Sequence, residues 1–443
     1  MSDVAFPAKL LSEQWDCVYG TEQELCPEIN PNNYNANFPL EDLTFPKGEF
    51  FSNGGKAYLD MNEFYEVCSP ETQNPLAAVL YNRAMLHLAK KLNPTRKFLR
   101  NGAESNGFTS GYHENFFTTL SIEERYHLVP FLISLQPLIG GGLLDPQDKS
   151  YRIHQRGPHI LSLKEEVASI KRGILDLRME PLSEVDGFYR MHQVLNDPSM
   201  CVFAEFLRIS TTALMIKALE QRVITPLDYD LDKSIEDLHA IGTSMSAWEL
   251  SGTRPKPMSA VQVQSYFLNQ IREHLHNKTP LTKFILDAWE HSLELLSAND
   301  PDYLIGYNDW ATKRWLLNEQ AMSYGCSIYD TPCQALEYEY HTLQFGKESL
   351  FQFFEKLKDF PMRIPNQLIY NASKKPPNNT RALARGLAVE NFHMSRYYSA
   401  KANWNRIDFY KYEENTKTRV AFLEMKDPRK TYLDDLKKII NNI

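Results

Sequence analysis

The feature of this sequence that most constrains its fold is a series of carboxylates on short, strand-like segments near the N-terminus. The first segment carries Glu22 and Glu24, and the second carries Tyr58 and Asp60. Side chains two positions apart on a β-strand point to the same face of the sheet. Each pair therefore shares a face, and the pattern predicts a sheet that gathers acidic side chains on one side.

Acids on one sheet face are typical of a site for a hard cation, because Mg²⁺ prefers a few carboxylate oxygens together with water and substrate phosphates. Glu66 joins this face only if the strand is regular through residues 61–65. Since the phosphate-loop pattern Gly-x-x-x-x-Gly-Lys-Ser/Thr is absent from the sequence, we predict ATP chemistry without such a loop. The residues alone leave open an ordinary solvated strand face. They also leave Asp60 as either a general base or a surface acid that caps a turn.

A second group of candidates combines a histidine with several arginines. The Gly- and Asn-rich segment 101–107 precedes His113 and Glu114, and such segments let the backbone approach a nucleotide closely. A buried structural histidine is the alternative. Arginines in loop-like settings suit bidentate capture of phosphate or carboxylate, with surface ion pairs as the alternative. These arginines are Arg156, Arg172, Arg178, Arg381 and Arg385.

The composition argues against several classes of partner. The chain has 443 residues and a net charge of -8, which does not favour binding to nucleic acid or to an anionic membrane surface. Its six cysteines show no zinc-ligand spacing and fit reduced thiols. The N-terminus lacks the order of a signal peptide, and no apolar run reaches the roughly 20 residues that span a bilayer. We therefore expect a cytoplasmic protein with neither a nucleic-acid nor a membrane partner.

Along the chain the pattern changes from strand-rich to helical. A capping box at 121–124 opens one helix. Helical periodicity covers 76–92, 203–222, 260–277, 281–297, 309–319 and 348–358. Prolines and a glycine interrupt 361–386, where we expect the domain boundary. We therefore predict one domain over 1–385 and a small C-terminal domain over 386–443.

Several short motifs follow one another in a fixed order along most of the chain. They are Gly20-Thr21-Glu22-Gln23-Glu24, Asn53 through Asp60, Ser69-Pro70-Glu71, Asn101 through Asn115, His154 through Ile160, Arg178-Met179-Glu180-Pro181, Tyr189-Arg190-Met191-His192, Asn196 through Met200, Asp309 through Lys313, Pro376 through Ala382, and Lys426-Asp427-Pro428. In this order they resemble the Pup–protein ligase and depupylase family, a branch of the glutamine-synthetase-like carboxylate–amine ligases. The resemblance implies an α+β fold, in which helices flank a curved antiparallel sheet cradle and a small α+β domain lies at the C-terminus.

The resemblance also implies roles for individual residues. Carried over by position, the Mg²⁺ ligands would be Glu22, Tyr58 and Glu66, and the catalytic base would be Asp60. Nucleotide contacts would come from Lys56, Ser69 and Tyr410, where the family usually has arginine, threonine and tryptophan. Candidates for a second cation, or for phosphate or substrate contacts, are Glu24, Glu71, His113, Glu114, Arg156, Arg178 and Arg381.

The implied reaction is an ATP- and Mg²⁺-dependent ligation in a bacterial cytoplasm. The γ-carboxylate of a C-terminal glutamate on a Pup-like protein tag would attack the γ-phosphate of ATP and give an acyl phosphate. A lysine amine of a target protein would then attack, forming an isopeptide bond. The expected partners are thus the tag and lysine-bearing target proteins, with a link to proteasomal degradation.

Two features favour a ligase over a depupylase. Only a short segment separates Glu24 from Tyr58, where depupylases carry a long inserted loop, and the six-residue step from Asp60 to Glu66 resembles the ligase pattern. The alternatives are a hydrolase that removes such a tag and a ligase that acts on a small-molecule amine. A third is an inactive binding module, against which the retention of Asp60 and the acids argues.

Overall fold

A ten-stranded sheet, of order β2-β3-β4-β1-β6-β11-β10-β9 with β5 pairing with both β1 and β14, organises the larger part of the molecule. Its pairings are antiparallel except for that of β9 with β10. Its strands are β1 (Tyr19–Pro27), β2 (Glu49–Phe50), β3 (Lys56–Leu59), β4 (Tyr65–Cys68), β5 (Lys97–Leu99), β6 (Tyr112–Thr118), β9 (Ile160–Glu165), β10 (Arg172–Asp176), β11 (Tyr189–Gln193) and β14 (Thr342–Gln344). The structure is a computed structural model and describes residues 6–27, 48–60, 64–103, 109–165, 172–177, 182–246, 248–344, 346–358, 360–392, 395, 397–413 and 416–443.

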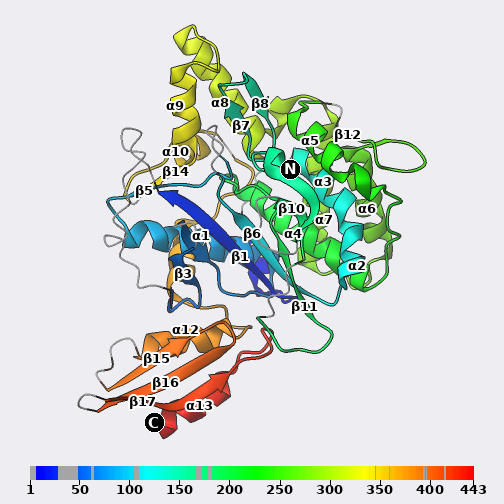
Figure 1. Ribbon diagram of the computed structural model, residues 1–443. Helices are drawn as coiled ribbons and strands as arrows, with labels where there is room; N and C mark the ends of the chain where they lie inside the picture. Colours follow the sequence, from blue (N-terminus) through cyan, green and yellow to red (C-terminus); the bar gives the residue numbers. More distant parts are fainter. Residues whose placement is uncertain are drawn as a thin grey trace.

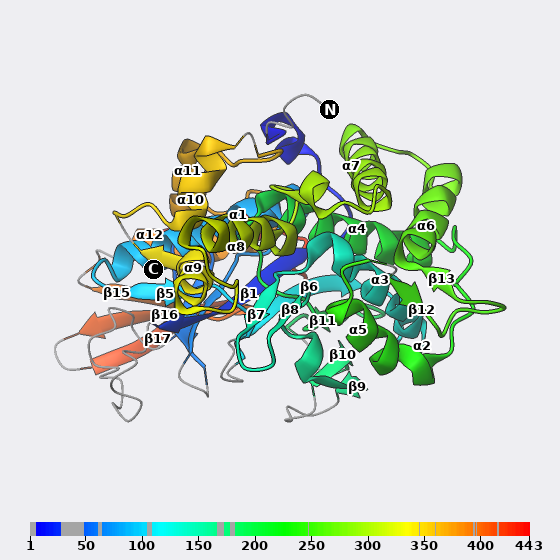
Figure 2. The same ribbon diagram turned by 90° about the horizontal axis from the view of Figure 1, so that it is seen from above.

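Helices cover one face of this sheet, and α1 and α4 lie on the same side of β1 and β6 (Figure 2). The helices are α1 (Pro75–Leu92), α2 (Ile122–Arg125), α3 (Val129–Ile139), α4 (Val202–Glu220), α5 (Ser234–Thr243), α6 (Ala260–His274), α7 (Pro280–Ser297), α8 (Asp309–Tyr324), α9 (Thr331–Tyr340), α10 (Leu350–Leu357), α11 (Asn366–Lys374), α12 (Ala382–Phe392) and α13 (Leu433–Asn442). The remaining elements are two small hairpins, β7 (Leu143–Asp145) with β8 (Ser150–Arg152) and β12 (Glu249–Leu250) with β13 (Met258–Ser259), and the 3-10 helices η1 (Ala8–Ser12), η3 (Tyr126–Leu128), η4 (Gly157–His159), η5 (Leu231–Lys233) and η6 (Pro301–Leu304). None of the helices in the described ranges combines the length and the apolar character that crossing a membrane requires.

The helix signals in the sequence predict these elements well. Asn74 accepts hydrogen bonds from the first backbone N–H groups of α1, and a proline follows it at the first helical position. The predicted capping box at Ser121 is also present, although the helix that it opens is only one turn long. Periodicity thus located the long helices to within a few residues at each end.

Strand β1 shows why the sheet has two different faces. Its side chains alternate, so that Thr21, Gln23 and Leu25 are buried while Glu22 and Glu24 are partly exposed. The buried set faces the helices. We call the other side, which carries Glu22 and Glu24, the acidic face.

The stretch from Tyr58 to Cys68, where the sequence pattern favours strand, forms two strands in place of one continuous strand. The chain ends β3 at Leu59 and begins β4 at Tyr65, and the two strands pair antiparallel. Glu66 therefore reaches the acidic face across a hairpin, opposite Tyr58, and not by continuing one regular strand.

The C-terminal residues form a separate layer below the main sheet (Figure 1). A three-stranded antiparallel sheet consists of β15 (Tyr398–Ala402), β16 (Arg406–Glu413) and β17 (Thr416–Glu424). Its own buried cluster includes side chains of β16 and β17 as well as Ala384 and Ala388 of α12 and Leu436 of α13. The division predicted at residues 385 and 386 thus falls inside α12, and we propose that the small domain begins with this helix. The α+β class with a mainly antiparallel sheet and a small C-terminal sheet domain is confirmed.

Candidate active site

The pairing of β1, β3 and β4 places the predicted acids in adjacent rows of the acidic face. Glu24 of β1 lies opposite Glu66 of β4, which in turn lies opposite Tyr58 of β3. In the next row Glu22 lies opposite Cys68, and Cys68 lies opposite Lys56. Six side chains from three segments of the sequence thus come together because three strands pair in this register.

Two histidines extend the acidic face on the other side of β1. His113 of β6 pairs with Glu22, and its Nδ1 lies 3.5 Å from Glu22 Oε2. His192 of β11 places Nε2 3.3 Å from the same oxygen, while its Nδ1 lies 2.8 Å from Asp176 Oδ2. Ligand atoms of Glu22, His113 and His192 all lie within 4.8 Å of one another. Such a group can hold a cation, and the Asp176 carboxylate orients the His192 imidazole within it.

The electrostatics of the acidic face favour a bound cation. Burial, together with the nearby carboxylate of Glu22, raises the pKa of Glu66 to about 8. Burial would also raise the pKa of Glu22, but Arg190 and His192 outweigh it and hold that pKa well below its usual value. A divalent ion between these carboxylates would supply the positive charge that Glu66 needs to ionise. The donor set of carboxylates, a phenol and imidazoles therefore fits a divalent cation.

Asp60 and Lys56 lie at the two ends of β3. The Asp60 carboxylate accepts a hydrogen bond from the backbone N–H of Phe64 at 2.7 Å, which holds it at the turn of the hairpin. Lys56 Nζ lies 4.8 Å from the centre of the Tyr58 ring. Asp60 thus caps the turn, and it also lies close enough to Glu66 to help raise the pKa of that carboxyl group.

A narrow pocket opens beside Glu22 and connects the two domains. Ser69 lines it at the end of β4, where its hydroxyl accepts a hydrogen bond from the Thr21 backbone N–H at 2.9 Å. The pocket is largely apolar, and its other walls come from Phe116, Phe117, Leu182, Trp404 and Pro428. An aromatic-lined slot of this kind suits a flat ring such as a nucleotide base.

Tyr410, which the resemblance assigns to nucleotide contact, does not line this pocket. It lies on β16 opposite Arg419 of β17, and Lys417 Nζ lies 4.5 Å from the centre of its ring. The aromatic side chain that the C-terminal domain contributes beside Ser69 is Trp404, in the turn before β16. Trp404 lies six positions before Tyr410 and is therefore a further candidate for nucleotide contact.

Glu71 and Arg381 pair with each other, which makes them poor candidates for phosphate or cation contacts. Arg381 Nε lies 2.8 Å from Glu71 Oε1, and Arg385 donates to the same carboxylate. Arg381 also donates to the backbone carbonyl of Met425 at 3.0 Å. The Glu71–Arg381 ion pair thus links the C-terminal domain to the end of β4.

Glu114, also predicted as a cation or phosphate contact, lies on the opposite face of the sheet from His113. Its carboxylate is buried and lies 2.6 Å from Arg208 Nε. The cause is the two-residue period of the strand, which sends neighbours to opposite faces. Arg178 lies outside the described residues.

Arg156 is a buried cation close to the acidic face. Only 2% of its surface is exposed, and its Nε and Nη1 have no hydrogen-bond partner among the described residues. Burial lowers its pKa to about 10, with Arg172 adding to the effect and Glu24 opposing it. A buried guanidinium with free donors is suited to an incoming anion.

Sequence reasoning missed several residues of the acidic face. His192 and Arg190 lie in a motif that we noted without assigning it a role, and Arg190 Nη2 lies 2.9 Å from Glu22 Oε1. Asn115 donates from Nδ2 to the same oxygen at 3.1 Å. The alternation Arg190-Met191-His192 on a strand is the signal that could have placed both polar side chains on one face.

The fold and the acidic face define an α+β enzyme whose charged side chains gather on one face of a mainly antiparallel sheet. The family described as Pup-ligase protein matches residues 17–408. This chain therefore belongs to the Pup-ligase protein family.

Curated relatives carry two different names. A Pup–protein ligase of Acidimicrobium ferrooxidans is 26% identical over 362 residues, which is 76% of this chain and 78% of that protein. A Pup–protein ligase of Xylanimonas cellulosilytica is 28% identical over 370 residues, covering 76% and 79% of the two chains. A depupylase of Acidothermus cellulolyticus is 25% identical over 407 residues, covering 87% and 80%.

Two solved structures share the fold over nearly the whole chain. The ligase PafA in complex with the prokaryotic ubiquitin-like protein Pup superimposes with a TM-score of 0.80 at 20% identity, covering 96% of this chain and 92% of that one. PafA in complex with ADP gives a TM-score of 0.77 at 20% identity, covering 93% and 94%. The likeness establishes the fold.

Proposed function

We propose that this protein is an ATP-dependent ligase that joins the γ-carboxylate of a C-terminal glutamate on a Pup-like tag to a lysine amine of a target protein. The observation that carries the proposal is the acidic face itself, with Glu24, Glu66 and Tyr58 in one row, Glu22 in the next, and Asp60 at the end of the same strand. Membership of the Pup-ligase protein family, and relatives that are mostly named Pup–protein ligase, support the same activity.

The nucleotide is proposed to lie in the pocket between the two domains. PafA has been solved with ADP, and the pocket of this chain offers Ser69 and Trp404 beside Glu22. A base stacked on Trp404 would direct the phosphates along the sheet toward the acids. Lys56, which lies at the near end of β3, would then contact a phosphate.

Glu22, Glu66 and Tyr58 are proposed to hold Mg²⁺, with Glu24 and His113 available for a second ion. When bound, the ion neutralises phosphate charge and aligns the transferred phosphoryl group. The chain itself supplies further positive charge through Arg156, which is buried and has two donor nitrogens without a partner among the residues that the structure describes. Preorganised charges of this kind stabilise a transition state without reorganising during the reaction.

In the first step an oxygen of the glutamyl γ-carboxylate attacks the γ-phosphorus of ATP. The bond from that phosphorus to the ADP oxygen breaks, which leaves an acyl phosphate and ADP. No proton moves in this step, so the protein's task is to position two anions against each other. Lys56 and Arg156 offset the repulsion between them.

In the second step the lysine amine attacks the acyl carbon and phosphate leaves, which forms the isopeptide bond. The amine arrives as an ammonium and must lose a proton before it can attack. Asp60, fixed by the Phe64 N–H at 2.7 Å, is proposed to take that proton. None of the six cysteines, all of which the structure describes, forms a disulfide, as expected for the reducing cytoplasm that we propose as the location. A link from the conjugate to proteasomal degradation stays a prediction.

The second candidate function is removal of the tag, since one relative that matches 87% of this chain is named depupylase. One assay distinguishes ligation of the tag from its removal. The purified protein is incubated with Mg²⁺, ATP, a tag ending in glutamate and a lysine-bearing acceptor, and in parallel with a preformed conjugate. The ligase predicts a heavier conjugate and one ADP per bond formed. Cleavage of the conjugate that outpaces its formation would reverse the assignment, and transfer to a free amine alone would indicate a small-molecule acceptor.

A further inference from the structure

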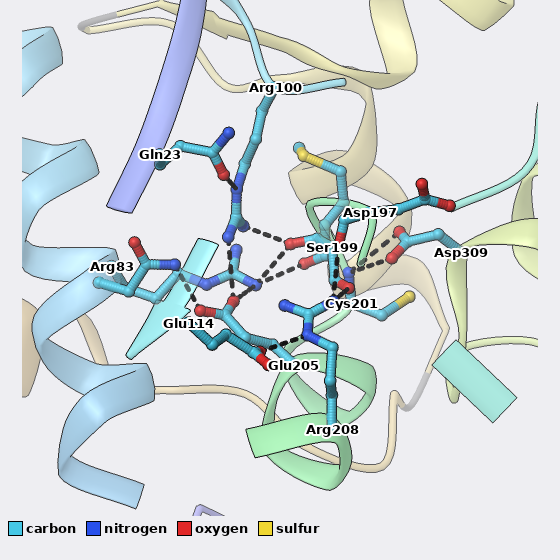
Figure 3. A network of polar contacts seen from close by, with 12 residues as sticks. Gln23, Arg83, Arg100, Glu114, Asp197, Ser199, Cys201, Glu205, Arg208 and Asp309 are labelled. Atoms are coloured by element: carbon cyan, nitrogen blue, oxygen red, sulfur yellow. Dashed lines mark hydrogen bonds and ion pairs between the residues drawn. The ribbon is translucent and has the colours of Figure 1, made fainter. Parts of the chain in front are cut away.

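A buried polar network lies behind the acidic face, on the helix side of the sheet (Figure 3). Its centre is the segment 196–201, which we call the hub. Backbone carbonyls of the hub accept hydrogen bonds from three arginines: Arg83 and Arg100 donate to Ser199, and Arg208 donates to Asp197 at 2.6 Å. The segment contains one motif of the ordered series in the sequence, but it lines neither the cation site nor the nucleotide pocket.

One arm of the hub reaches β1. Arg100 Nε donates to Gln23 Oε1 at 3.2 Å, and Gln23 Nε2 donates to the Gly111 carbonyl at 3.3 Å. Gln23 lies between Glu22 and Glu24 and points to the opposite face. Because the Gln23 side chain is hydrogen-bonded on the helix side of the sheet, β1 is fixed in position, and so are the Glu22 and Glu24 carboxylates that it carries.

A second arm reaches β6. Arg208 Nε donates to Glu114 Oε1 at 2.6 Å, and Asn196 Nδ2 donates to Glu114 Oε2 at 3.2 Å. The neighbours of Glu114 in the strand are His113 and Asn115, and both approach Glu22 on the acidic face. The buried carboxylate therefore lies directly behind the two β6 side chains that approach Glu22.

A third arm reaches the loop of Arg156. The Asp197 carboxylate accepts hydrogen bonds from the backbone N–H groups of Gly141, Gln155 and Arg156, at 2.9, 2.8 and 2.9 Å. Three N–H donors on one buried carboxylate hold this loop against the sheet. The arm thus sets the position of Arg156, whose guanidinium Nε and Nη1 find no hydrogen-bond partner within the described part of the chain.

We propose that the hub is a positioning device that fixes the distance between the cation site and Arg156, with Glu114 as the positioning residue for the cation side and Asp197 as that for the anion side. The proposal deepens the proposed function and rests on it for the identity of the cation and the phosphate. Packed, hydrogen-bonded networks in a low-dielectric interior tolerate little movement. A small shift of β6 or of the Arg156 loop would therefore change the distance between the cation site and Arg156. The affinity for a cation and a phosphate bound together would change with it.

The test compares Glu114→Gln and Asp197→Asn with Asp237→Asn, in the full chain. Asp237 is an equally buried acid, but its hydrogen-bond donors are Tyr229, Ser251 and Gly252, none of which belongs to the acidic face. Calorimetric titration with Mn²⁺ reports the cation site, and titrations with ATP and ADP without metal report the γ-phosphate. Thermal unfolding of each variant reports the structural cost separately.

Glu114→Gln is expected to weaken Mn²⁺ binding at least tenfold while it changes metal-free ADP binding less than twofold. Asp197→Asn is expected to reduce the ratio of ATP to ADP affinity severalfold, and the Asp237→Asn control to change neither at a similar melting temperature. If Glu114→Gln fails to fold because Arg208 is left unpaired, the double variant Glu114→Gln/Arg208→Gln replaces it. Mn²⁺ affinity within twofold of the control would overturn the positioning role. Because these titrations need no conjugation, a failed ligation assay would sink the proposed function without deciding this one.

Discussion

At the residue scale, Asp60 has the proposed role that is simplest to test. Asp60→Asn keeps the side chain's size and its acceptor oxygen for the Phe64 N–H but cannot take a proton from an amine. We expect nucleotide affinity to stay within twofold and conjugate formation to fall by roughly 100-fold or more. Gel-shift assays of conjugation and calorimetry with ADP measure the two. Asp302→Asn, at an exposed acid outside the site, is the control, and an active Asp60→Asn would show that another group is the base.

Trp404 and Tyr410 offer a second test at the same scale, because the structure separates two aromatic residues of the same domain. Trp404 lines the pocket beside Ser69, and stacking of a base on an aromatic ring contributes roughly 1–3 kcal/mol. Trp404→Ala should therefore weaken ADP binding about tenfold or more, whereas Tyr410→Ala should leave it unchanged. Isothermal titration calorimetry with ADP measures the affinity of each variant. Equal losses in both variants would indicate a general loss of the small domain's structure.

The acids of β1 and the aromatic residues of the C-terminal domain show where sequence reasoning is reliable and where it is not. Alternation on a strand correctly put Glu22 with Glu24, and the same rule, applied to His113, places Glu114 on the far side. The resemblance assigns nucleotide contact to Tyr410 by its position in the sequence, whereas the pocket is lined by Trp404 in the turn before β16. Position along the sequence does not reveal which residue of a hairpin faces a pocket. The partners of Glu22 on β6 and β11 depend on strand order, a long-range property that no local pattern contains.

At the scale of elements, the Glu71 cluster connects β4 to α12. Burial would raise the pKa of Glu71, but Arg385 and Arg381 outweigh it and lower that pKa to about 2. A carboxyl whose folded pKa is depressed stabilises the fold above its unfolded pKa of about 4.5, and this stability is lost as the pH falls toward 2.

Glu71→Gln should therefore destabilise the protein by about 3 kcal/mol at pH 7, as the shift converts at roughly 1.4 kcal/mol per pH unit. The difference from the wild type should shrink steadily as the pH is lowered from 5 toward 3. Urea unfolding at several pH values, followed by the fluorescence of the tryptophans, measures it. A difference that is constant with pH would mean that the ion pair contributes no net electrostatic stability.

At the scale of the whole molecule, the pocket between the domains links nucleotide binding to their association. Its walls come from β1, from the end of β4, and from Trp404 and Pro428 of the C-terminal part. A ligand at about 100 times its Kd stabilises the state that binds it by about 2.7 kcal/mol. We expect Mg²⁺ and ADP to protect amides of β16 from hydrogen exchange as well as those of β1. Protection confined to β1 would place the nucleotide away from the C-terminal domain.

The central claim is that a glutamyl carboxylate attacks ATP, and oxygen transfer tests it most directly. The tag is prepared with ¹⁸O in the γ-carboxylate of its C-terminal glutamate and incubated with the protein, Mg²⁺, ATP and a lysine-bearing acceptor. One oxygen of that carboxylate becomes the bridging atom of the acyl phosphate, so each conjugate formed should release one phosphate that carries a single ¹⁸O. Mass spectrometry of the phosphate reads the label. Conjugation that yields unlabelled phosphate, or labelled tag that the protein only releases from conjugates without forming ADP, would contradict the account.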